Sequence, residues 1–345
     1  MVWAAMDKLR WGILATGRIA GVFARGIAAS QTGRLVAVAS RTREAAARFA
    51  GEYGASRAYG SYEALLEDRE VTAVHIATPH PLHAEWTMRA AAAGKHILCE
   101  KPLTLNHATA VPVVDAARRH GVLLMEAFMY RCHPQTAKIV ELVRAGALGR
   151  VGLVQATFGF RRDFSPGVRL WDKALGGGGI LDIGCYPVSL ARLVAGAMDG
   201  LPFADPVAVA GTGHLHPQAG VDVYAAATLK FANELVAQVA CGIGMEQDNS
   251  ARIYGDEGWL HVPVPWGPAR DGGTTTLYLH RRGAAAPEAM TVTAAPLYAL
   301  EADAFAAALA AGLREVPQMT TADTLGNMVV LDRWRATVGL VYDGE

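Results

Sequence analysis

The sequence predicts a mixed α/β fold in which a doubly wound parallel sheet is followed by a second, largely antiparallel sheet. Two observations predict it. Over the first 130 residues, short apolar runs alternate with segments whose apolar residues recur at helical spacing. Beyond that point, apolar and polar residues alternate along several extended stretches. The first pattern is typical of βαβ units, and the second is typical of antiparallel strands that bury one face.

The chain of 345 residues is long enough for two domains, each with a sizeable core. We expect the first domain at residues 1–130. Its strands are expected at 9–14, 35–40, 73–77, 96–99 and 123–126. Its helices are expected at 19–29, 43–53, 83–93 and 108–120.

We expect the second domain at residues 131–345, after a boundary that no long linker marks. Helices are expected at 133–145, from near Ile180 onwards, at 299–311 and at 322–338. Alternating stretches predict strands at 151–160, 207–214, 222–231 and 235–243.

The composition argues against several classes of partner. Lys plus Arg and Asp plus Glu both number 32, so no basic field favours nucleic acid or an anionic membrane. No run of eighteen apolar residues predicts a bilayer span. The histidines lack metal-binding spacing, so we expect no metal. The isolated cysteines indicate buried thiols in a reducing cytoplasm, and they are Cys99, Cys132, Cys185 and Cys241.

A turn with the pattern of a dinucleotide site follows the first predicted strand. Ala15, Gly17 and Ala20 occupy the three small-residue positions of G-x-G-x-x-G/A. Gly17 would allow close approach of a pyrophosphate to the helix N-terminus, whereas Ala15 must adopt the turn despite its Cβ. An ordinary tight turn is the alternative, but the position in a βαβ unit favours the nucleotide site. The expected contacts are Ala15, Thr16, Gly17, Arg18 and Ile19.

The end of the second strand favours NADP over NAD. An NAD site places an acid there to bind the ribose 2′-hydroxyl, but no acid precedes Glu44. Arg41 could stack on adenine and pair with a 2′-phosphate, and Ser40 could donate a hydrogen bond to it. The alternative is that Arg41 and Arg43 simply begin a solvated helix.

The tripeptide Glu100-Lys101-Pro102 places a lysine where a buried strand ends. Ligands of doubly wound folds bind at the carboxyl ends of the strands, so Lys101 could handle a substrate proton beside a nicotinamide. The alternative is a solvated loop lysine.

A glycine run at 176–179 precedes a predicted helix that carries Asp182 and Tyr186 on one face. Tyr186 could exchange a proton with the substrate oxygen, and we expect the Lys101 cation to lower the pKa of Tyr186. Asp182 could orient a sugar hydroxyl. Alternatively, Asp182 favours its helix dipole and Tyr186 packs in the core.

These motifs together resemble the Gfo/Idh/MocA oxidoreductases, over nearly the whole chain. The similar segments are GILATGRIA (12–20), ATPHPLH (77–83), EKP (100–102), MEAFMYRCHPQ (125–135), GGGILDIGCYP (177–187) and LDRWR (331–335). The chain is most similar to the branch with dimeric dihydrodiol dehydrogenase, NADP-dependent D-xylose dehydrogenase and sugar ketoreductases.

The resemblance implies a Rossmann domain that binds NADP, followed by an open-sheet α/β domain for substrate binding and dimerisation. It implies catalytic roles for Lys101 and Tyr186 and a substrate-binding role for Asp182. It also implies cofactor contacts at Ala77, Thr78, Pro79, His80, His83, Glu100, Lys101, Arg169 and Trp171. The chain has Tyr186 where inositol dehydrogenases have His, and His80 where the family more often has Asn.

The sequence therefore predicts an NADP-dependent oxidoreductase that transfers a hydride between nicotinamide and a secondary alcohol, hemiacetal or carbonyl of a sugar-like substrate. A trans-dihydrodiol or dicarbonyl reductase is the alternative enzyme. A catalytically silent NADP-binding regulatory protein is the alternative of another class. We expect a homodimer or homotetramer formed through the C-terminal sheet. Tyr130, Arg131 and His133 follow the last strand of the first domain and could line the cleft, whereas a histidine at a helix start is alternatively a cap or packing residue.

Overall fold

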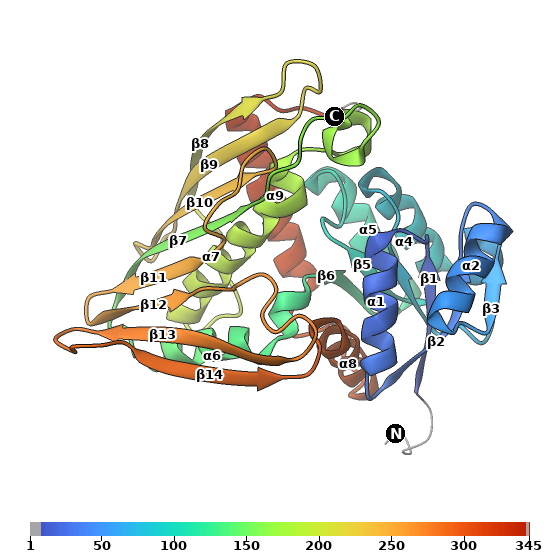
Figure 1. The fold of residues 1–345 in the computed structure, drawn as a ribbon, viewed down its shortest axis with the longest axis horizontal. Coiled ribbons are helices and arrows are strands. Elements are labelled where there is room, and N and C mark those ends of the chain that lie inside the picture. The colour runs from blue at the N-terminus through green and yellow to red at the C-terminus, as the bar shows by residue number, and fades with distance from the viewer. Residues whose placement is uncertain (1–7, 343–344) are drawn as a thin grey trace.

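The computed structural model describes residues 8–342 and 345, and its N-terminal part is built on a parallel sheet (Figure 1). This sheet A has the order β3-β2-β1-β4-β5-β6, with every neighbouring pair parallel. The predicted doubly wound sheet is confirmed. Successive strands are added on one side of β1 up to β3 and on its other side from β4 onwards, and such folds bind ligands at this switch point between β1 and β4. The strands are β1 (Leu9–Leu14), β2 (Gly33–Ala39), β3 (Arg57–Tyr59), β4 (Ala73–Ile76), β5 (His96–Glu100) and β6 (Leu124–Ala127).

Helices connect these strands close to the predicted positions. They are α1 (Arg18–Ala29), α2 (Arg43–Tyr53), α3 (Tyr62–Leu66), α4 (His83–Ala92) and α5 (His107–His120). The sequence analysis missed β3 and α3, because each is too short to show a period, and β3 is only half-buried.

The second sheet, sheet B, is mostly antiparallel and follows the order β14-β13-β12-β11-β7-β10-β9-β8. Its single parallel pair in the described chain joins β7 and β10. The strands are β7 (Val151–Gly159), β8 (Ala208–Leu215), β9 (Asp222–Lys230), β10 (Val236–Gly242), β11 (Ala251–Gly255), β12 (Gly258–Val262), β13 (Gly273–Arg281) and β14 (Glu288–Ala294). The first four lie near their predicted places, and the last four were not predicted.

The remaining helices join the two sheets. Figure 1 shows α7 and α9 between sheet B and the Rossmann part, and α8 beside α1. The bounds are α6 (Pro134–Arg144), α7 (Cys185–Met198), α8 (Leu297–Ala310) and α9 (Thr321–Val338). A π-helical turn, Ile180–Gly184, leads directly into α7. The predicted domain boundaries, 1–130 and 131–345, stay a prediction. Helix α8 belongs to the second range but packs against α1 of the first.

Among the described residues, the segment Lys173–Met198 is long and apolar enough, by composition alone, to cross a membrane. The sequence analysis had found no such segment. In the fold, 94% of its most apolar window is buried inside the protein. Its apolar surface is therefore already covered, as expected for a helix that is hydrophobic all round and packed in a core.

Candidate active site

The turn between β1 and α1 has the shape of a phosphate site. Ala15 has φ +82°, a left-handed conformation that glycine adopts without strain, so this chain tolerates a Cβ where the pattern has Gly. Gly17 is the N-cap of α1, and no side chain caps that helix start in the described structure. A Cβ added at Gly17 would meet no described atom within 4 Å. The free N–H groups and the open space fit an anionic group.

The end of β2 lies beside this turn. The hydroxyl groups of Thr16 and Ser40 are 3.1 Å apart and hydrogen-bonded. Arg41 follows and is exposed, and no hydrogen bond or ion pair joins it to another residue of 8–342 or 345. The structure thus brings the predicted turn and the predicted 2′-phosphate contacts together at one edge of sheet A.

The loop after β4 carries two buried histidines. His83 lies between the carbonyl oxygens of Thr78 and Pro102, at 2.8 and 2.9 Å from its ring nitrogens. It therefore ties this loop to the residue that follows Lys101. Burial lowers the pKa of His83 below its ordinary value.

His80 joins the same loop to the glycine run and to Arg169. Its Nδ1 is 3.1 Å from the carbonyl oxygen of Gly176, and its Nε2 is 3.3 Å from an Arg169 nitrogen. Burial, with the positive charge of Arg169 next in importance, holds the pKa of His80 well below its usual range. His80 is therefore neutral at physiological pH.

Lys101, Asp182 and Arg169 form the charged centre of the site. The Lys101 ammonium donates to the backbone oxygen of Asp182 at 2.5 Å and lies 3.8 Å from its carboxylate. Arg169 donates to the same carboxylate at 2.7 Å. Burial alone would raise the pKa of Asp182, but the charges of Lys101 and Arg169 outweigh it and hold that pKa at about 2. Asp182 is an anion between two cations.

Tyr186 presents its ring to Lys101 and its hydroxyl to a sulfur atom. Lys101 Nζ lies 5.3 Å from the ring centre, and the hydroxyl donates to Met129 Sδ at 3.5 Å. The ring is enclosed by Phe128, Tyr130, Phe158 and Trp266. The expectation that Lys101 lowers the pKa of Tyr186 is wrong, because burial raises that pKa well above its ordinary value. The phenol therefore stays protonated.

Two other predicted residues bond elsewhere. The buried Glu100 carboxylate is 3.1 Å from His75 Nε2, within the core of sheet A. Trp171 donates to the carbonyl oxygen of Asp163 and packs on Phe164 and His216. Both residues stay predicted cofactor contacts, and neither bonds to the charged centre in the described structure.

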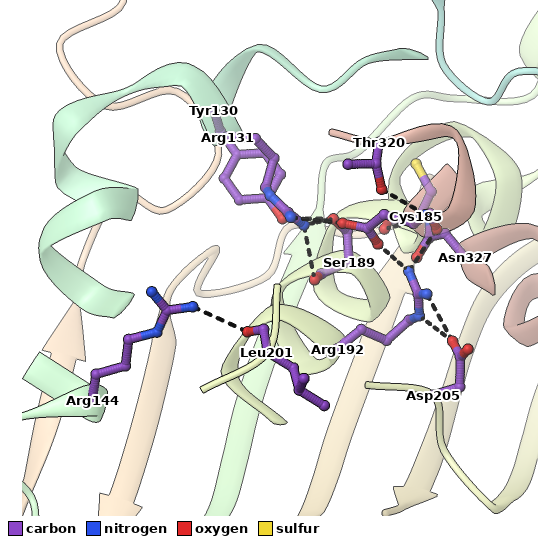
Figure 2. A network of polar contacts seen from close by, with 11 residues as sticks. Tyr130, Arg131, Arg144, Cys185, Ser189, Arg192, Leu201, Asp205, Thr320 and Asn327 are labelled. Atoms are coloured by element: carbon purple, nitrogen blue, oxygen red, sulfur yellow. Dashed lines mark hydrogen bonds and ion pairs between the residues drawn. The ribbon is translucent and has the colours of Figure 1, made fainter. Parts of the chain in front are cut away.

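Arg131 lies in a buried polar network that is separate from the charged centre of Lys101, Asp182 and Arg169. Figure 2 shows it in a buried polar network with Tyr130, Ser189 and Arg192. Arg131 and Arg192 both bind the Asp323 carboxylate, at 2.7 and 2.5 Å. The network joins α7 and α9 to the segment after β6.

Sequence reasoning missed three features of the site. Met129 meets the Tyr186 hydroxyl, and Phe158 and Trp266 flank the Tyr186 ring. Glu126 is a buried carboxyl group on β6 and binds the segment that follows Lys101. A charged residue within an apolar strand was the sequence signal that could have identified Glu126 as part of the site. The aromatic contacts had no local signal, because three distant segments supply them.

No group of three or more His, Cys, Asp or Glu side chains in the described parts of the chain could hold a metal ion. All four cysteines lie in those parts, and none forms a disulfide there.

Comparison with known proteins gives relatives over almost the whole chain. The trans-1,2-dihydrobenzene-1,2-diol dehydrogenase of Danio rerio is 35% identical over 98% of this chain and 99% of its own. The D-xylose 1-dehydrogenase (NADP(+)) 2 of Haloferax volcanii is 36% identical over 86% of this chain and 87% of its own. A solved 3-ketoreductase from Actinomadura kijaniata, in complex with NADP and TDP-benzene, has a TM-score of 0.85 at 30% identity and covers 96% of this chain and 98% of its own.

Two family matches agree with the architecture. Residues 9–128 match an oxidoreductase family with an NAD-binding Rossmann fold, and this range covers sheet A. Residues 136–261 match the GFO/IDH/MocA C-terminal domain, which covers α6 to β12. The resemblance inferred from the motifs is confirmed: this chain belongs to the GFO/IDH/MocA family of oxidoreductases.

Proposed function

We propose that this protein is an NADP-dependent oxidoreductase that interconverts a secondary alcohol or hemiacetal and the matching carbonyl of a sugar-like substrate. One observation carries the proposal. Lys101 contacts both Asp182 and Tyr186, which lie about eighty residues further along the chain, at the edge of sheet A that bears the nucleotide turn. The NADP-linked relatives named above support the cofactor.

The residues present fit NADP. The uncapped start of α1 and the open space at Gly17 would hold the pyrophosphate. Ser40 and the unpaired guanidinium of Arg41 would hold the 2′-phosphate, because a planar guanidinium pairs well with phosphate oxygens. Bound NADP supplies or accepts the hydride.

The side chains of the site manage the proton and the developing charge. In the reducing direction the substrate oxygen gains negative charge as the hydride arrives, and the Lys101 ammonium stabilises that charge. The neutral phenol of Tyr186 can then give up its proton to complete the alcohol, since the weak thioether acceptor of Met129 holds it only loosely. Asp182 stays ionised and accepts from the substrate hydroxyls or from Arg169.

The test is the change in absorbance of reduced nicotinamide with a panel of aldoses, ketosugars, polyols and diols. We expect Lys101→Met and Tyr186→Phe to lower kcat by about 10²- to 10⁴-fold while NADPH binding is retained. Arg41→Glu should weaken NADPH far more than NADH. Full activity in both catalytic variants, or equal effects of Arg41→Glu on the two cofactors, would refute the corresponding assignment.

A trans-dihydrodiol or dicarbonyl reductase is the second candidate. The aromatic side chains of Phe158 and Trp266, stacked at 5.8 Å beside Tyr186, favour a flat ring over a fully hydroxylated one. The substrate panel described above separates the two candidates, because a sugar oxidoreductase and a dihydrodiol dehydrogenase would show their higher kcat/KM with different substrates.

We also propose that two copies associate through the exposed face of sheet B and that the protein works in the cytoplasm. Helices α7 and α9 cover the other face of this sheet, which leaves small side chains such as Ala210, Ala226 and Thr228 exposed. Small residues on a flat sheet permit close face-to-face packing of a second copy. The four free thiols suit a reducing compartment.

A further inference from the structure

A buried carboxyl group, Asp222, lies at the start of the helix that carries the proposed catalytic residues. Asp222 begins β9 in sheet B and is fully buried. Its Oδ2 accepts a hydrogen bond from the backbone N–H of Ile180 at 2.7 Å. Burial of a carboxyl group is costly unless it is hydrogen-bonded, so this contact is the main compensation visible in the described residues.

The glycine run is shaped around this carboxyl group. A Cβ at Gly178 would overlap Asp222 Oδ1, and a Cβ at Gly179 would lie 3.1 Å from Oδ2. Gly178 also has φ +106°, which side chains rarely adopt. The glycines therefore let the backbone reach Asp222, which explains two of the four glycines at 176–179.

The contact replaces a local helix cap. Neither Gly179 nor Gly184, the residues that precede the π-helical turn and α7, can offer a side-chain acceptor. The first N–H groups of a helix need acceptors, and an oxygen at this end also suits the helix dipole. Asp222 supplies that acceptor from another element. Oδ1, its second oxygen, has no hydrogen-bond partner within the described residues.

The position of this turn sets the position of the site. Asp182 lies two residues after Ile180, and its backbone oxygen and carboxylate both face Lys101. Tyr186 follows in the first turn of α7 and places its ring against the same ammonium. A shift of the turn therefore moves both residues relative to Lys101.

We propose that Asp222 is a positioning residue for the reaction: by holding the N–H of Ile180, it fixes the turn that presents Asp182 and Tyr186 to Lys101. The inference rests on the proposed function, because it requires that Asp182 and Tyr186 take part in turnover. Within the described structure, Asp222 forms no hydrogen bond or ion pair with the side chains of Asp182 and Tyr186.

The test compares Asp222→Ala with the conservative Asp222→Asn. The amide oxygen of Asn can still accept from Ile180, so we expect Asp222→Asn to stay within a few-fold of the parent kcat. Asp222→Ala should lower kcat about 10- to 100-fold, since a displacement of reacting groups by about 1 Å has that effect. The dissociation constant for NADPH, measured by fluorescence titration, should stay unchanged in both variants.

Two controls separate positioning from simple loss of folding. Thr320→Ala removes a helix cap from α9, far along the chain from the glycine run, and should lower the melting temperature with no change in kcat per bound NADPH. Gly178→Ala pushes on the same carboxyl group from the other side and should reproduce the low kcat, which keeps the test usable if Asp222→Ala does not fold. All rates are expressed per NADPH site titrated.

The inference is overturned if Asp222→Ala or Gly178→Ala keeps the parent kcat per site, or if Asp222→Asn loses as much kcat as Asp222→Ala. These outcomes differ from a failure of the proposed function, which Lys101→Met reports. Full activity in Lys101→Met would refute the catalytic assignment, whatever the Asp222 variants show.

Discussion

At the scale of single residues, the hydrogen bonds of His80 fix which ring nitrogen carries the proton. A guanidinium only donates hydrogen bonds, so the Nε2 atom that faces Arg169 must accept, and the ring proton lies on Nδ1. Nδ1–H then donates to the carbonyl oxygen of Gly176. A neutral imidazole thus offers one donor and one acceptor, and it joins the loop after β4 to both the glycine run and Arg169.

The amide of asparagine can replace Nδ1–H but does not reach the position of Nε2, so we expect His80→Asn to keep the bond to Gly176, to lose the one to Arg169 and to retain kcat/KM within about tenfold. His80→Leu has nearly the same size but leaves Gly176 and Arg169 without their partner. The loss of a buried partner costs about 1–3 kcal/mol, so kcat/KM should fall about 10- to 100-fold. Steady-state kinetics from pH 5 to 9 check this. Equal losses in both variants would show that the bond to Gly176 is not what His80 provides.

At the scale of elements, the end of β5 is held by its neighbour β6. Lys101 follows β5 directly, and the backbone N–H of Leu103 donates to Glu126 Oε1 on β6 at 2.8 Å. The other oxygen of Glu126 is buried without a partner in the described structure. Burial raises the pKa of Glu126 to about 7. The segment that presents Lys101 is thus anchored to a carboxyl group that is costly to ionise.

This gives a pH dependence of stability with a definite sign. The folded state holds the proton on Glu126 up to about pH 7, whereas the unfolded state releases it near 4.5. The contribution of Glu126 to the free energy of unfolding is therefore complete below pH 4.5 and is lost as pH rises through 7. The loss is on the order of 3 kcal/mol. Glu126→Gln should flatten this part of the profile in urea unfolding at pH 5 and pH 8. An unchanged difference between the two pH values would contradict it.

At the scale of the whole molecule, the two sheets have different surroundings. Helices cover both faces of sheet A, whereas α7 and α9 cover only the inner face of sheet B (Figure 1). Sheet B is therefore the part of the molecule with a broad face left for a partner. Helix α7, which carries Tyr186, packs on the inner face of that sheet, so association would also stabilise the layer that supports the site.

Ala226→Arg tests this arrangement. Ala226 is exposed midway along β9, the second strand from one edge of sheet B, so a long charged side chain should leave the fold intact and block a second copy. Light scattering should report a dimer for the parent and a monomer for the variant. Lys230→Ala, at the end of the same strand, is the matched control and should stay dimeric. A monomeric parent would exclude the proposed dimer.

The sequence could predict most of sheet A and little of the outer half of sheet B. Strands such as β1 and β4 are buried on both faces, so they appear as continuous apolar runs between helical segments. Strands β11 to β14 carry Arg252, His261 and His280 on the solvent face and were missed. Their short, interrupted alternation resembles loop sequence until neighbouring strands supply the hydrogen bonds.

The sequence by itself determined the parallel sheet, because short apolar runs alternate with helical segments, and its motifs indicated the family and the pairing of Lys101 with Tyr186. Only the tertiary structure decided which way the Tyr186 hydroxyl points and how its pKa shifts, because burial among aromatic rings from separate segments outweighs one nearby cation. It also decided the contact between Asp222 and the N–H of Ile180, since a carboxyl group on one sheet can cap a helix only after both have folded together.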